Sequence, residues 1–173
     1  ETEMGLFDGF KGGEQATMGI SDALKAELDR NEWNYEISNE NDQNRQETYF
    51  YMRNELENDE TITAVIVVRE YNHADGFIKI KLYDIAYLEE DHLRGALLAK
   101  INEWNADFRY VKFCLDRDQD VVLDIDLPLD LHEGTFQPSS VMAMMGVGMR
   151  IVEKVYDDVM ELCTRGHQPR PQE

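Results

Sequence analysis

The sequence predicts a single α+β domain in which helices pack against one antiparallel sheet. A chain of 173 residues is long enough for one core and short for two. Its hydrophobic fraction of 42% is typical of globular proteins. Most of its strand-like runs are joined by short polar links, whereas a parallel return needs a crossover of about a dozen residues. The expected order is helix, four strands, helix, two strands, helix.

The first helix is expected over 17–30, where Ile20, Leu24 and Leu28 share one face. Thr17 or Ser21 is the expected cap. Residues 1–16 are Gly-rich and show no periodicity, which is typical of a flexible leader. The domain is therefore expected to span 17–163, and residues 164–173, with two prolines and no pattern, are expected to form a disordered tail.

Four strands are expected next, and their short links favour a meander. The third is apolar on both faces at its centre, which predicts a place in mid-sheet. The fourth alternates strictly, with Lys79 and Lys81 pointing outward, and Gly76 before it suits a hairpin. The polar stretch 39–46 is typical of a solvated loop. The four runs cover 33–38, 47–54, 62–71 and 77–83.

The second helix is expected over 89–105, with acidic residues at its positive end. Two strands follow over 108–115 and 121–127. In the second of them Asp124 and Asp126 are expected to point to water. The apolar stripe of the helix consists of Leu93, Ala96, Leu97, Ile101 and Trp104.

The last helix is expected over 138–163, with Ser139 and Ser140 after Pro138 as the cap region. Its apolar arc covers about half the circumference, wider than the stripe of ~100° that a surface helix needs. Gly146 and Gly148 are expected to permit close packing. Met142, Met149 and Met160 lie at the edge of the arc. Methionine recurs at adaptable binding surfaces, so this edge is either core or a partner surface.

A net charge of −19 bounds the possible partners. It repels phosphate backbones and disfavours nucleic acid, and it either steers basic partners or only maintains solubility. No apolar run approaches the ~18–20 residues of a membrane span. Cys114 and Cys163 form no CxxC motif, which favours reduced cysteines of a cytoplasmic protein over a disulfide.

The segment DRDQD (116–120) raises the question of a metal site. An EF-hand loop requires Gly at position 6 and Glu at position 12, but counting from Asp116 these are Val121 and Leu127. Val121 instead begins an alternating strand, so the aspartates are interpreted as a hairpin turn.

Other catalytic signatures are absent from the sequence. The four histidines have no HxxxH or HExxH spacing, and GFKGG (9–13) lacks the GK[ST] of a phosphate loop. Both cysteines are flanked by core-type residues, which favours inert burial. The sequence therefore predicts no enzyme, no metal and no cofactor.

Two segments resemble a known family. They are LRGALLAKINEWN (93–105), with Arg94 and the pair Asn102 and Asn105, and the hairpin FRYVKFCLDRDQDVVLDIDLPL (108–129) before a long helix. Over about 17–163 the chain resembles the YbjN family, although Gln119 and Asp120 stand where that family often has Gly. The resemblance implies a type III secretion chaperone-like fold, an acidic and often dimeric domain, a role in regulating signal transduction, and no catalytic residues.

These observations predict a non-enzymatic, cytoplasmic homodimer that binds a protein partner, basic or partly unfolded. Leu98 and Trp104 of the second helix are the candidate dimer contacts. The alternative is a regulator that responds to a small molecule or a metal through the acidic hairpin. Binding to nucleic acid or membrane is not expected.

Overall fold

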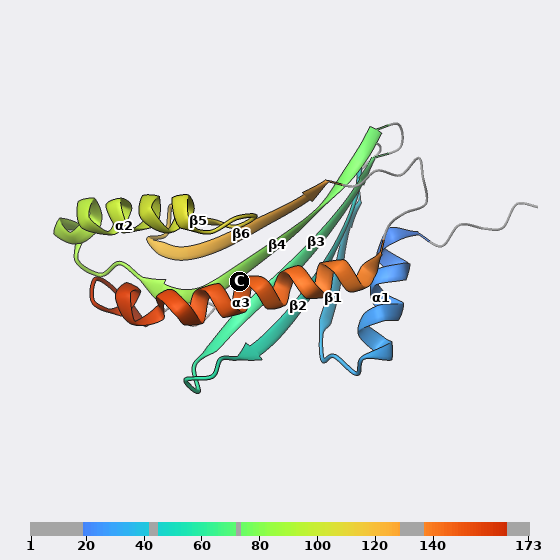
Figure 1. Cartoon of the computed structure of the whole chain (residues 1–173). Helices are drawn as coiled ribbons and strands as arrows, with labels where there is room; N and C mark the ends of the chain where they lie inside the picture. The colour runs from blue at the N-terminus through green and yellow to red at the C-terminus, as the bar shows by residue number, and fades with distance from the viewer. Residues whose placement is uncertain (1–18, 42–44, 72–73, 129–136, 166–173) are drawn as a thin grey trace, which may run out of the picture.

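The computed structural model describes residues 19–41, 45–71, 74–128 and 137–165, and within them seven strands form one antiparallel sheet (Figure 1). The strand order is β1-β2-β3-β4-β6-β5, and β7 pairs with β4. The strands are β1 Glu36–Asn41, β2 Arg45–Glu55, β3 Thr61–Tyr71, β4 Ala74–Tyr87, β5 Lys112–Leu115, β6 Asp120–Pro128 and β7 Thr164–Arg165. The helices are α1 Ile20–Arg30, α2 Arg94–Asp107 after a 3-10 turn at Asp91–Leu93, and α3 Pro138–Met160.

The predicted α+β class and the order of the main elements are confirmed, but the bounds of β1 were wrong. The strand begins at Glu36 instead of Trp33 and continues into the polar stretch that suggested a loop, because Asn41 still pairs with Gln46. Polar side chains are compatible with this strand, since it lies at the edge of the sheet. Thr164 and Arg165, expected in a disordered tail, pair with Tyr87 and Ala86.

The core lies between the sheet and the helices. Phe50, Ile66, Ile80 and Ile125 stand opposite one another across β2, β3, β4 and β6, each no more than 1% exposed. Burying each such side chain stabilises the fold by about 1.5–3 kcal/mol. The buried faces of the helices complete the core, with Leu24 and Leu28 from α1, Leu97 and Trp104 from α2, and Met145 and Val152 from α3.

Neither predicted serine cap is present. The N-cap of α1 is Gly19, and a carboxylate from β3 meets the helix instead: Glu70 accepts from the Ile20 amide at 3.4 Å and from the Ser21 hydroxyl at 3.1 Å. A carboxylate at this end is favoured by the helix dipole. Thr17 lies outside the described residues. In α3 the helix begins at Pro138, so Ser139 and Ser140 lie inside its first turn.

Two glycines allow a close approach of the backbone to neighbouring elements. A Cβ at Gly148 of α3 would lie 3.1 Å from Ile125 Cδ1 and 3.2 Å from Leu82 Cδ1, so the predicted packing role is confirmed there. For Gly146 the prediction was wrong, since a Cβ there would meet only the Arg150 side chain, at 3.6 Å. Gly76 lies inside β4 and not in a turn. A Cβ there would lie 2.2 Å from the carbonyl oxygen of Arg69, where the register of β3 and β4 shifts.

The two glycines of α3 are expected to respond in opposite ways to a larger side chain. Gly148→Leu overpacks the contact with the sheet and should lower the free energy of unfolding by about 1–3 kcal/mol. Gly146→Ala should raise it by about 0.5–1 kcal/mol, because its Cβ would meet only the tip of Arg150 and alanine favours the helix. Denaturant unfolding measures both. Equal effects of the two substitutions would contradict the packing of α3 on the sheet.

Candidate functional site

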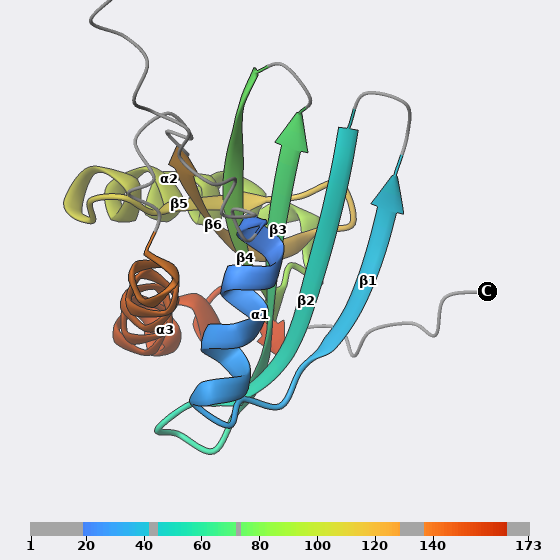
Figure 2. The same ribbon diagram turned by 90° about the vertical axis from the view of Figure 1, so that its right-hand side faces the viewer.

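One side of strands β1–β4 carries no helix among the described residues. Figure 2 shows α1 and α3 together on the other side. We call the uncovered side the open face. It consists of the side chains that alternate with the core positions, such as Tyr51, Val65 and Lys81, which stand opposite one another across β2, β3 and β4. Antiparallel sheets often leave one face without a covering layer. Of these three side chains, Tyr51 and Lys81 are partly exposed, whereas Val65 is only 6% exposed.

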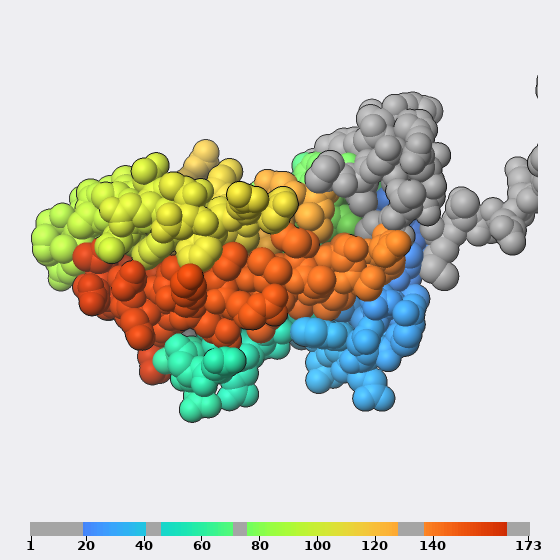
Figure 3. All heavy atoms as spheres, in the orientation of Figure 1, coloured from blue at the N-terminus to red at the C-terminus, as the bar shows by residue number. Residues whose placement is uncertain are grey.

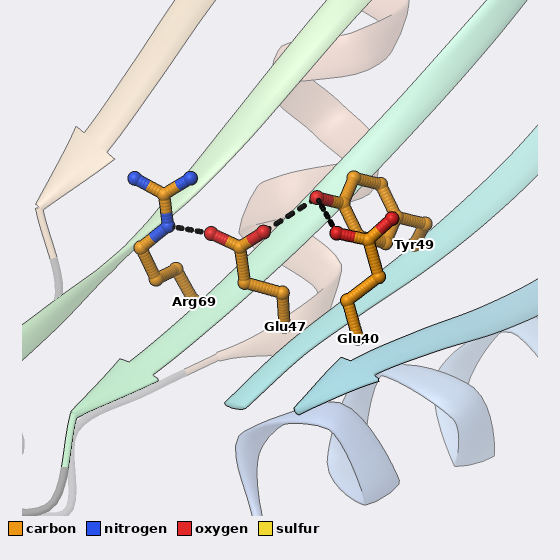
Figure 4. Close-up of polar contacts among 4 residues, drawn as sticks. All are labelled: Glu40, Glu47, Tyr49 and Arg69. Atoms are coloured by element: carbon orange, nitrogen blue, oxygen red, sulfur yellow. Dashed lines mark hydrogen bonds and ion pairs between the residues drawn. The ribbon is translucent and has the colours of Figure 1, made fainter. Parts of the chain in front are cut away.

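A buried acidic residue organises one end of the open face (Figure 4). Glu47 is 2% exposed, and its Oε1 forms an ion pair with Arg69 Nε. The Tyr49 hydroxyl donates to Glu47 Oε2 at 2.5 Å and lies 3.4 Å from Glu40 Oε2. The hydrogen bond to Glu47, followed by burial, raises the pKa of the Tyr49 phenol. The buried carboxylate is thus held by a cation and a neutral donor.

Lys79 of the open face is also paired with neighbouring carboxylates. Lys79 Nζ lies 3.0 Å from Asp124 Oδ2 and 3.7 Å from Asp126 Oδ1. Asp124 is only 9% exposed, so the expectation that it points to water was wrong, whereas Asp126 is exposed as expected. Asp124 stands opposite Lys81 and diagonal to Lys79 on β4, so its carboxylate lies between the two lysine positions. Lys81 Nζ lies 4.7 Å from the centre of the Tyr83 ring.

The two edges of the sheet differ in how their backbone groups are paired. Along β5, the Asn105 side chain of α2 accepts from the Phe113 amide at 2.7 Å and donates to the Phe113 carbonyl at 3.0 Å. The side-chain amide of Asn105 therefore pairs with the Phe113 backbone as a further strand would. In the described part of the chain β1 has one strand neighbour, β2, and pairs with it without a register shift. Ile37 of β1 is 46% exposed.

The predicted partner residues differ in how far they are exposed. Leu98 of α2 is 47% exposed, but Trp104 is only 5% exposed and packs against the Phe113 ring at 5.3 Å. Trp104 therefore contributes to the core of the chain. Met142, Met149 and Met160 are partly buried against the core. They belong to α3, which lies along the surface between α2 and the connection of β2 to β3 in Figure 3.

The acidic hairpin is a turn stabilised by its own aspartate. Asp116 Oδ1 accepts from the Asp118 amide at 2.9 Å and from the Asp120 amide at 3.0 Å. Gln119 takes the left-handed conformation, with φ at 69°, that the family's glycine would favour. Among the described residues, no group of three or more His, Cys, Asp or Glu side chains is arranged to hold a metal ion.

Both cysteines are free thiols. Cys163 is buried, and burial raises its pKa to about 11. Cys114 is half-buried in β5, and burial, together with the charge of Asp124, raises its pKa. A raised thiol pKa keeps the unreactive protonated form at neutral pH.

Sequence reasoning missed the pair of Glu47 and Arg69 and the edge pairing by Asn105. The first pair joins residues opposite one another on β2 and β3, which only the register reveals. The sequence of 47–54 gave no signal for it, because polar residues occur on both sides of this strand. Asn105 was noted only as part of a resemblance, because a helix-to-strand side-chain bond has no fixed sequence spacing.

A family model matches residues 21–161, and its description is "YbjN: putative bacterial sensory transduction regulator". The chain belongs to the YbjN family. The match extends from α1 to the end of α3, so the open face and both sheet edges lie within the YbjN region. Neither a curated protein nor a solved structure matches the chain. No described helix of this YbjN-family chain has the length and hydropathy needed to cross a membrane.

The Tyr49 phenol should stabilise the fold in a pH-dependent way. Tyr49→Phe should lower the free energy of unfolding at neutral pH by about 1–3 kcal/mol, because it removes a hydrogen bond to a charged acceptor. The folded pKa is raised above the unfolded value, so this stability is present below pH ~10 and is lost as the pH rises toward the folded pKa.

Denaturant unfolding from pH 7 to pH 11 tests this. The difference between wild type and Tyr49→Phe should shrink above pH ~10. Tyr110→Phe is the matched control, since Tyr110 is 77% exposed and should show no effect. A difference that stays constant over the whole range would contradict the role of the phenol.

Proposed function

We propose that this YbjN-family chain is a non-catalytic cytoplasmic regulator that binds a basic, extended segment of a partner protein along β1. The contrast between the two edges of the sheet supports this proposal. Asn105 satisfies the amide and the carbonyl of Phe113 on β5, whereas β1 pairs on one side only in the described chain. An exposed regular edge strand is a template for strand addition, and proteins usually block such edges with bulges, proline or lysine. β1 has none of these.

Charge favours a basic partner over a second copy at this edge. Glu36 and Glu40 are exposed on β1, and the whole chain carries −19. If two copies paired through β1 about Ser38 in antiparallel fashion, Glu36 of one would stand opposite Glu40 of the other. Like charges directly opposite destabilise a strand pair, whereas Lys or Arg at those positions would stabilise it. The negative surface would also speed the encounter with a basic segment.

The side chains of β1 indicate the pattern of the partner segment. Glu36, Ser38 and Glu40 point to the open face, and Ile37 points to the opposite side, because Ile37 stands opposite the core residue Phe50. A strand added beside β1 would alternate in the same way. The favoured segment therefore carries basic residues at every second position and apolar residues between them.

The other proposals have less support. The acidic hairpin is weaker as a ligand-responsive site, because the Asp116 carboxylate already accepts two backbone hydrogen bonds. A partner on the helices would contact Leu98 or the exposed parts of Met142, Met149 and Met160.

The non-catalytic assignment is supported by the turn role of Asp116 and by the raised thiol pKa of Cys163.

Peptide binding tests the edge. A fluorescent peptide of alternating Lys and Val should bind, and its affinity should fall with salt, as charge attraction requires. The same peptide with its two central valines replaced by proline keeps its charge but should not bind, because proline cannot donate a backbone hydrogen bond to the neighbouring strand. Ile37→Asp should weaken binding by about tenfold or more through loss of the apolar contact.

Leu98→Asp is the matched control, since Leu98 and Ile37 are almost equally exposed. It should leave peptide binding unchanged. Equal binding of the proline peptide would show that charge alone attracts the ligand. A loss confined to Leu98→Asp would place the partner on α2, and either result would contradict strand addition at β1.

A further inference from the structure

The register of β1–β4 arranges the open face in rows of fixed side-chain chemistry. One row runs Glu36, Tyr51, Val65, Lys81. The next runs Ser38, Tyr49, Val67, Lys79. Each row is acidic or polar on β1, aromatic on β2, aliphatic on β3 and basic on β4. When a row is turned end to end and laid on an identical row, its acidic or polar side chain meets a basic one, and its aromatic side chain meets an aliphatic one.

We propose that two copies of the chain pack through their open faces about a two-fold axis that runs along the strands between β2 and β3. This rotation places β1 of one copy over β4 of the other and β2 over β3. Each residue keeps its position along the strand direction, so equivalent rows of the two copies lie over each other. Glu36 then faces Lys81 of the second copy, and Tyr51 faces Val65 of the second copy. Two-fold contacts of this kind use the same patch on both subunits.

Known sheet packing is compatible with this arrangement. Two sheets that pack face to face keep their strand directions within about 30°, so equivalent rows stay close at their centres. The centres hold Tyr51, an aromatic side chain of the kind enriched at interfaces, and Val65, which is 6% exposed in the single chain. A third row has Glu47 and Arg69 at its two central positions. Under the same rotation, Glu47 of each copy faces Arg69 of the other.

The charges of the open face favour a second copy of the chain as its partner. Any self-contact must bring two chains of −19 together, and an interface with an excess of carboxylates would oppose that. On the open face Arg69 pairs with Glu47, and Lys79 pairs with Asp124 and Asp126, so these charges remain paired when water is excluded. Lys81 lies over the Tyr83 ring with no ion pair among the described residues, and Glu36 of the second copy would supply its partner.

The inference goes beyond the proposed function and does not depend on it. Strand addition at β1 uses backbone groups in the plane of the sheet, whereas this contact is perpendicular to that plane. Ile37 points away from the open face, so Ile37→Asp should leave the dimer unchanged. The two ideas therefore fail in different experiments.

Sedimentation equilibrium of the full chain over a range of concentrations tests the dimer. The wild type should reach a mass of twice 20.1 kDa. Glu36→Lys and Lys81→Glu should each weaken the dimer at least tenfold, and the double variant should restore it. Within one chain these residues lie three strand spacings apart, about 14 Å, so the rescue cannot arise inside a chain.

Matched controls separate local contact from overall charge. Glu89→Lys and Arg150→Glu change the net charge by the same amounts at exposed positions away from the open face. They should weaken the dimer less than threefold. Lys81→Met removes the pair without adding a charge and serves if Lys81→Glu does not fold, as judged by circular dichroism. A monomeric wild type at about 0.1 mM, opposite effects of the two single charge reversals, or a double variant without rescue would overturn the proposal.

Discussion

The strict alternation of side chains in β2, β3 and β4 is the constraint on which the rest of the structure depends. Because successive side chains point to opposite sides of a strand, the same residues that build the core fix what lies on the open face. Phe50, Ile66 and Ile80 point to α1 and α3, so Tyr51, Val65 and Lys81 must point away. A slip of one residue in any of these strands would exchange the two sets, and burial of the apolar set prevents it.

The polar interactions of the molecule follow from this arrangement. Glu47 and Arg69 meet because their positions are opposite on neighbouring strands, and Lys79 meets Asp126 for the same reason. Lys79 also reaches Asp124, which stands diagonal to it on β6. The helices lie on one side of the sheet, so α2 can bring Asn105 to β5 while β1, at the far edge, is left with β2 as its strand neighbour in the described residues. The difference between the edges is thus a consequence of where the helices pack.

Much of this fold could be predicted from the sequence, because the strongest signals come from buried elements. The alternation in 77–83, the central place of β3 and the apolar arc of α3 all reflect burial, and the structure confirms them. The hairpin at 116–120 was also correctly predicted, from the missing EF-hand positions and the alternating strand after them.

The wrong predictions involve residues whose environment depends on distant parts of the chain. β1 was displaced because an edge strand with polar side chains resembles a loop. Asp124 was assigned to water because its neighbour Lys79 lies 45 residues earlier in the sequence. The caps of α1 were misplaced because Glu70, a residue of β3, takes their role. The open face and the edges could not be identified for the same reason, since register and strand order define them.

Amide hydrogen exchange of the chain without a partner tests most directly the claim that one edge of the sheet is closed and the other is open. The Phe113 amide, which donates to Asn105, should exchange slowly, as amides in the centre of β3 do. Alternate amides of β1 should exchange quickly, because they point away from β2. Slow exchange at every amide of β1, or fast exchange at Phe113, would contradict the account.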